Sequence, residues 1–179
     1  MSLSLYDVSI PIYDRMLRNL TTFLDKAEAH AKEGGVDLKT YAEASLGHGM
    51  FAFARQVQLA SDAAKGGAAR LAGVEAPAMP DTETTFPELR ERIAKTLAFL
   101  ASVRREQVDG QEGREIVLTF PGRSMTFTGE SFLTTFSLPN FLFHVTTAYA
   151  ILRSQGVPLG KMDYLAGAQT AALAAAQTA

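Results

Sequence analysis

Apolar residues recur every three or four positions along the N-terminal segment, and this spacing is the strongest constraint on the fold. The series is Leu5, Val8, Ile12, Met16, Leu20, Phe23 and Ala27. Such a stripe is typical of an amphipathic helix with one face turned toward a core. Gly34 and Gly35 can end the helix, because glycine readily adopts the left-handed conformation found at helix C-termini. The predicted helix has roughly 28 residues, against about 11–12 for an average helix, and long paired helices of this kind favour a bundle.

Three later segments carry the same helical signal. After a connector over 36–44 with room for one helical turn, we expect a second helix over about 45–71. A proline-punctuated linker follows, and the third helix begins at a Thr85-x-x-Glu88 capping box. The last helix runs from about Ser137 to Gly156. Glycine can end a helix in the left-handed conformation, and the proline two residues later cannot continue it.

Residues 115–128 change to a two-residue period. Ile116, Leu118 and Phe120 alternate with polar or smaller residues, and Met125 and Phe127 do so after a Pro-Gly turn. This pattern predicts a short β-hairpin. Two strands alone are marginally stable, so the hairpin should pack on the helices or on another subunit.

The sequence therefore predicts a mainly α protein, a four-helix bundle with a short β-hairpin before the last helix. We expect a single bundle domain over residues 1–166. Residues 167–179 form an Ala-rich tail that has helix propensity but little to bury. We expect this tail to be peripheral or to contact another subunit.

Charge and composition narrow the classes of partner. Lys and Arg number 17 against 19 Asp and Glu, a net charge of −2, so neither a nucleic-acid surface nor a polybasic membrane surface is expected. The chain has no cysteine, which excludes disulfides, thiolate metal sites and cysteine nucleophiles. No apolar run approaches the roughly 18 residues of a membrane span, and no signal-peptide pattern is present. We expect a cytoplasmic protein.

Asn140 and His144 form a polar pair on the otherwise apolar last helix. Their spacing of four places both on one face. Burying an unpaired polar group costs about 1–3 kcal/mol, so either neighbours satisfy the pair or it faces a ligand or metal. Both readings stay open.

The second predicted helix contains three more candidate site residues. His48, Arg55 and Asp62 are seven residues apart and so fall within roughly one face. A buried Asp62 would need a partner such as Arg55, or Arg153 across the bundle, and a structural tie between helices is the commoner outcome. Tyr149 has a hydroxyl that could reach the same site, although core packing is its commoner role.

Known catalytic and phosphate-binding motifs are absent. The sequence contains no Gly-x-Ser-x-Gly elbow and no completed glycine-rich phosphate loop. We therefore assign no catalytic residue and expect no nucleotide cofactor.

The C-terminal part resembles a known family. The residues that carry the resemblance are Pro139-Asn140-Phe141-x-Phe143-His144-x-x-Thr147-Ala148-Tyr149-x-Ile151-Leu152-Arg153 and the run Gly156-Val157-Pro158-Leu159-Gly160-Lys161. They are similar to the signature of an uncharacterised bacterial domain-of-unknown-function family, grouped with the DinB/YfiT-like four-helix bundles. Arg55-Gln56-Val57-Gln58 and the segment 85–93 agree with it, and the resemblance spans roughly residues 5–166.

The resemblance implies a metal site. Members of that superfamily often bind a divalent metal through one histidine of the second helix and a His-x-x-x-His pair of the fourth. His48 and His144 are the matching residues, but Ala148 stands where the second histidine of the pair would be. The implied metal is Zn, Ni, Mn or Fe. Asp62, Asn140 or Tyr149 could replace the missing ligand, and oxygen ligands would favour a harder metal.

Two functional hypotheses follow. The first is a DinB-like bundle, dimeric and non-catalytic or small-molecule-binding, with a polar pocket of Asn140, Asp62, Arg55 and Tyr149. The alternative is a divalent-metal-dependent hydrolase or thiol-transferase that uses an incomplete histidine site. The alanine at position 148 favours the first.

Overall fold

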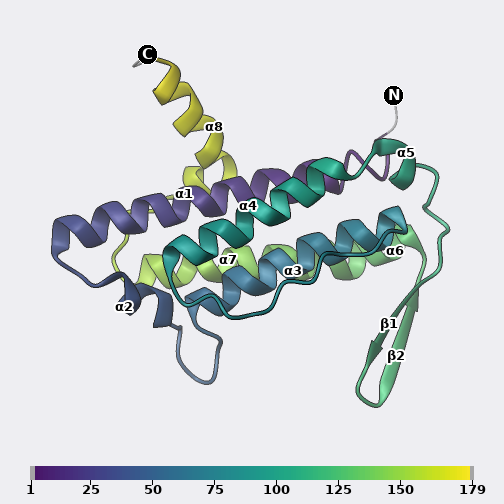
Figure 1. Cartoon of the computed structure of the whole chain (residues 1–179), viewed down its shortest axis with the longest axis horizontal. Coiled ribbons are helices and arrows are strands. Elements are labelled where there is room, and N and C mark those ends of the chain that lie inside the picture. The colour runs from purple at the N-terminus through teal and green to yellow at the C-terminus, as the bar shows by residue number, and fades with distance from the viewer. Residues whose placement is uncertain (1–2, 178–179) are drawn as a thin grey trace.

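The computed structural model describes residues 3–177 and shows a helical bundle with one projecting hairpin (Figure 1). The helices are α1 (Ile10–Gly34), α2 (Leu38–Glu43), α3 (Phe53–Ala72), α4 (Phe86–Ser102), α5 (Arg105–Val108), α6 (Gly129–Phe132), α7 (Leu138–Ser154) and α8 (Lys161–Gln177), with a π-helical turn η1 (Leu133–Ser137) before α7. The strands are β1 (Ile116–Phe120) and β2 (Arg123–Phe127). The predicted fold class is confirmed.

Helices α1, α3, α4 and α7 form the bundle. Helices α3 and α4 run in the same direction, because Phe53 packs on Phe86 and Ser61 bonds to Thr96 further along both helices. A parallel pair needs a long return, and the linker over 73–85 crosses back along α3 to supply it (Figure 1).

Helices α3 and α7 run in opposite directions. Gln56, near the start of α3, meets His144 in the middle of α7, whereas Gly67, near the end of α3, lies against Ser137 before α7 begins. The two helices therefore share a long common face, and the candidate site lies on it.

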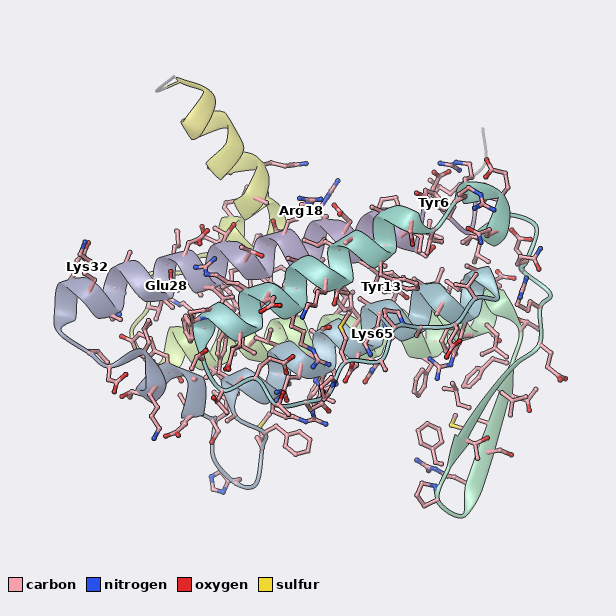
Figure 2. All side chains as sticks on the ribbon, viewed as in Figure 1. Tyr6, Tyr13, Arg18, Glu28, Lys32 and Lys65 are labelled. Atoms are coloured by element: carbon pink, nitrogen blue, oxygen red, sulfur yellow. The ribbon has the colours of Figure 1, made fainter. Side chains whose placement is uncertain are left out.

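The core lies between the four helices and includes most of the apolar residues that the helical spacing predicts, whereas Val8 and Ile12 are only half-buried. Leu20, Phe23 and Ala27 of α1 are completely buried, and Tyr13 points from the same helix into the bundle (Figure 2). The Thr85–Glu88 capping box is present at the start of α4, as predicted.

The first helix is shorter than predicted. It begins at Ile10, and residues 5–9 form a turn in which the Ser9 hydroxyl donates to the Leu5 carbonyl.

The second bundle helix also begins later than predicted. Residues 45–52 form a loop, and α3 starts at Phe53. Gly47, His48 and Gly49 all have positive φ angles, of 84°, 51° and 80°, which a right-handed helix cannot contain. The prediction that His48 lies at the start of a helix, on one face with Arg55 and Asp62, is wrong for this reason.

The hairpin has the predicted position, with Ile116 paired to Phe127 and Phe120 to Arg123. It packs on the helices, because Phe127 contacts Phe132 and Phe136. Of the two expected partners, the helices and another subunit, the structure shows the helices.

Helix α8 packs on α1 and is kinked at Ala166, whose φ is −148°. The fully buried Asn19 bridges the kink: its amide donates to the Tyr164 carbonyl at 2.7 Å, and its Oδ1 accepts from the Ala168 amide at 3.0 Å. Part of the predicted Ala-rich tail, residues 178–179 and the side chains from 171 onward, lies outside the described residues, and its contacts stay a prediction.

Within residues 3–177, none of the helices combines the length and the apolar character that crossing a membrane requires.

Candidate functional site

His144 lies half-buried on the face that α7 shares with α3. Its Nδ1 is 2.8 Å from Oε1 of Gln56, a side chain that is only 2% exposed. The amide nitrogen of Gln56 donates to the Phe51 carbonyl at 3.3 Å, which fixes Oε1 as the atom that faces the histidine. A carbonyl oxygen only accepts, so Nδ1 of His144 carries the proton and Nε2 keeps its lone pair.

The protonation state of His144 follows from its surroundings. Burial, and next the positive charge of Arg55, lower the pKa of its imidazole below the ordinary value of 6.5. At neutral pH the ring is therefore uncharged. Its Nε2 can accept a hydrogen bond or a proton, or bind a metal ion.

One exposed apolar side chain lies beside this histidine, and a second belongs to the residue whose carbonyl holds Gln56. The Phe143 ring meets the imidazole edge-on with 5.3 Å between ring centres. Phe143 and Phe51 are 55% and 58% exposed, and the Arg55 guanidinium lies 5.8 Å from the centre of the Phe51 ring. Large exposed aromatics next to an oriented polar group are typical of a binding surface.

Asn140 and Asp62 come together in a cavity of about 210 Å³, one helical turn from His144. Arg70 and Ser137 add polar groups, and the apolar wall includes Phe136 and residues of β1. Within the described residues, the carboxamide of Asn140 makes no hydrogen bond. The π-helical turn η1, which ends at Ser137, lies at the edge of this cavity, and such turns occur frequently at functional sites.

Arg55 and Asp62 also belong to a charge network around Arg92. Arg92 is completely buried, and its guanidinium contacts Asp62 at 2.7 Å, Asp81 at 2.9 Å and Glu83 at 3.0 Å. Arg55 contacts Asp81 from the other side. The network ties α3, α4 and the linker together.

The partner of Asp62 differs from the two that the sequence suggested. It pairs with Arg92 and Lys65, not with Arg55 or Arg153. Figure 2 shows Lys65 on α3 where the linker passes, and its ammonium group also donates to the Pro77 carbonyl. The ion pairs of Asp62 are thus a tie between helices, the commoner of the two outcomes.

Sequence reasoning missed Arg92 and Gln56. Arg92 is three residues from Leu89 and next to Ile93, both buried, so its place on the apolar stripe of α4 was a signal for a buried cation. Gln56 is likewise three residues from Phe53 and next to Val57, both buried, but only the opposite helix shows that its partner is His144.

Two predicted site residues lie elsewhere. Tyr149 packs against Phe23 and Tyr164 on the side of α7 that faces α1 and α8. His48 is exposed on the 45–52 loop, and within the described structure it has no hydrogen bond to His144.

The donor set does not fit the three-histidine metal site that the resemblance implies. Within residues 3–177 there is no group of three or more His, Cys, Asp or Glu side chains that could hold a metal ion. Ala148, at the position of the missing histidine, is completely buried, so the packed core has no space for an imidazole there. The side chain opposite His144 is the carboxamide of Gln56.

Comparisons with known proteins agree on the family. A family model described as "Domain of unknown function (DUF1993)" matches residues 5–165. A crystal structure of a DinB family member protein from Shewanella denitrificans superimposes with a TM-score of 0.82 at 41% sequence identity, covering 90% of this chain and 91% of that one. None of the curated proteins matches.

Proposed function

The chain belongs to the DUF1993 family and has the DinB-like fold, and on this premise we propose that it is a small-molecule-binding protein whose site surrounds His144. The observation that carries the proposal is the bond between Gln56 Oε1 and His144 Nδ1. A buried glutamine that holds an imidazole in one tautomer prepares its other nitrogen for a partner.

The neighbouring groups define the chemistry of the ligand. Nε2 of His144 accepts a hydrogen bond, so the ligand should carry an N–H or O–H donor. Asn140, one turn away on α7, can both donate and accept. Phe51 and Phe143 supply exposed apolar surface, so the ligand should combine a small polar group with a flat or apolar part.

The test is an NMR screen of small polar aromatic compounds against the whole chain, with the histidine rings labelled. Binders should shift the ring signals of His144 and lose their affinity in His144→Ala. His30→Ala is the matched control, because His30 also has its Nδ1 in a hydrogen bond, 2.7 Å from the Tyr41 hydroxyl. A screen in which no compound moves the His144 signals, or in which both variants bind equally well, contradicts the proposal.

We also propose that the protein forms a homodimer through its hairpin. In the described part of the chain the sheet has two strands only, so both edges are open, and Val117 is 50% exposed. Open edges favour pairing with a further strand, and two-fold dimers are the commonest soluble assembly.

Sedimentation equilibrium checks the dimer. The wild-type protein should sediment as a dimer, and Val117→Lys, which adds a charge to the sheet, should shift it toward the monomer. A wild-type protein that is monomeric up to the concentrations used for NMR rules the dimer out.

A divalent-metal-dependent hydrolase or thiol-transferase is the alternative. One observation favours it, because metal-binding histidines usually donate their second ring nitrogen to a fixed acceptor, as His144 does to Gln56. Elemental analysis after dialysis against Zn, Ni, Mn and Fe, beside His144→Ala, decides between the two. Near-stoichiometric metal that disappears in the variant would establish the alternative.

A further inference from the structure

A second and larger cavity, of about 790 Å³, does not include His144 in its wall. It is bounded by α2, the first turns of α3 and the start of α4. Leu38, Ala42, Ala54, Phe86 and Pro87 give it an apolar wall. The volume lies within the range of about 300–1,000 Å³ that small-molecule sites occupy.

The wall of this cavity includes Arg55, a cation whose position is fixed by neighbouring side chains. Its Nη1 donates to Gln58 at 3.0 Å and to Asp81, and these two bonds orient the guanidinium. Its Nε and Nη2 have no hydrogen-bond partner among the described residues, and the side chain is 34% exposed. A guanidinium held by one nitrogen presents the other two as a fork that matches a carboxylate.

The acidic residues of the wall already have partners. Glu83 accepts bonds from Arg92 and Gln58. Asp37 caps α2 by accepting from the Lys39 amide, and Glu43 lies 3.6 Å from the Lys39 ammonium. With these carboxylates compensated, the free donors of the wall belong to Arg55 and to the exposed Lys39, and both cations select a negative charge.

We propose that this cavity is a second binding site and that it takes an amphiphilic carboxylate. The acid group would bind Nε and Nη2 of Arg55, and the hydrocarbon or aromatic part would lie against Ala42, Ala54 and Phe86. His144 does not line this cavity, so either of the two proposals can fail without the other.

The test compares 4-phenylbutyrate with its neutral isostere 4-phenylbutyramide on the ¹⁵N-labelled full chain. The acid should shift the backbone amides of residues 38–43 and 52–58. It should bind about tenfold more tightly than the amide, as expected for a charge-assisted hydrogen-bond pair. Equal affinities, or no shift in these segments, would overturn the proposal.

Four variants keep the test specific. Arg55→Gln should reduce the affinity of the acid to that of the amide, whereas the exposed Arg153→Gln should change neither. Because Arg55→Gln also removes the contact with Asp81, Ala54→Phe provides a second variant that fills the cavity and leaves Arg55 intact. It should abolish the binding of both compounds, and unchanged binding in Ala54→Phe would contradict the assignment. His144→Ala should leave this site unaffected.

Discussion

The carboxamide oxygen of Gln56 lies 2.8 Å from Nδ1 of His144, and this contact across two antiparallel helices determines which nitrogen of the imidazole is available. Gln56 is itself held by the Phe51 carbonyl. A backbone group of the 45–52 loop therefore sets, through one side chain, the tautomer of a histidine that is 88 residues away from Gln56 in the sequence.

Replacing Gln56 by Leu should release this tautomer. Without the acceptor, Nδ1 no longer holds its proton preferentially, and the ring should shift toward the form protonated at Nε2. The ¹⁵N chemical shifts of the His144 ring measure the two forms directly. The loss of one hydrogen bond should also lower the free energy of unfolding by about 1 kcal/mol. An unchanged ¹⁵N pattern would show that another group holds the ring.

Stability should depend on pH through His144. Its pKa in the folded protein lies below the value of 6.5 that it has when unfolded, because of burial and the charge of Arg55. Between these two pKa values the unfolded chain binds a proton that native His144 does not, so the free energy of unfolding rises with pH across that window. Above pH 6.5 His144 contributes no slope.

Urea unfolding across this window measures the effect in the wild-type protein and in His144→Gln. The variant should lose part of the slope, and His48→Gln, a change on an exposed loop, should keep it. The hydrogen bond from Arg105 lowers the pKa of Asp7 from 3.8 to about 2, so this carboxyl adds a slope of its own around and below pH 3.8, and the comparison is made above that range. Identical slopes in His144→Gln and the wild type would contradict the prediction.

Arg92→Met should destabilise the protein strongly. Three carboxylates converge on this buried guanidinium, and removing one partner of a buried charge network costs about 3–5 kcal/mol. We expect the lower end, about 3 kcal/mol, because Asp62 and Asp81 are one-third exposed and can regain water.

Two measurements check the Arg92 prediction. Urea unfolding gives the loss of stability, and limited proteolysis should show faster cleavage within 73–85, because Arg92 also holds the Pro80 carbonyl of the linker. Arg153→Met, at an exposed position, is the control. A loss of less than about 1 kcal/mol would mean that the network contributes little.

Asn19→Ala should loosen α8 from α1. The change leaves the Tyr164 carbonyl and the Ala168 amide without their partner at the kink, at a cost of about 1–3 kcal/mol. Hydrogen exchange should accelerate most in residues 161–170, whereas exchange of the α3 amides should accelerate less, because it follows the smaller change in global stability. Equal protection of α8 in the variant and the wild type would show that apolar packing alone holds it.

The sequence by itself determined the elements whose signals are local. Spacing of three and four placed the bundle helices, the Thr85–Glu88 box placed the start of α4, and alternation placed the hairpin. Each of these signals acts within a few residues, because backbone hydrogen bonds and caps join near neighbours in the chain. The family resemblance rests on such a run too, the signature around His144.

Only the tertiary structure decided how these elements meet. The parallel course of α3 and α4, the pairing of Asp62 with Arg92 and the contact of Gln56 with His144 all join residues that are at least 30 positions apart. The sequence offered several partners of the right charge for Asp62, and the choice among them depends on which helix faces become neighbours. The 45–52 loop shows the same limit, since apolar spacing predicted a helix where two glycines and His48 take left-handed angles. Packing selects one arrangement from many that local preferences allow, and the candidate sites are built from that selection.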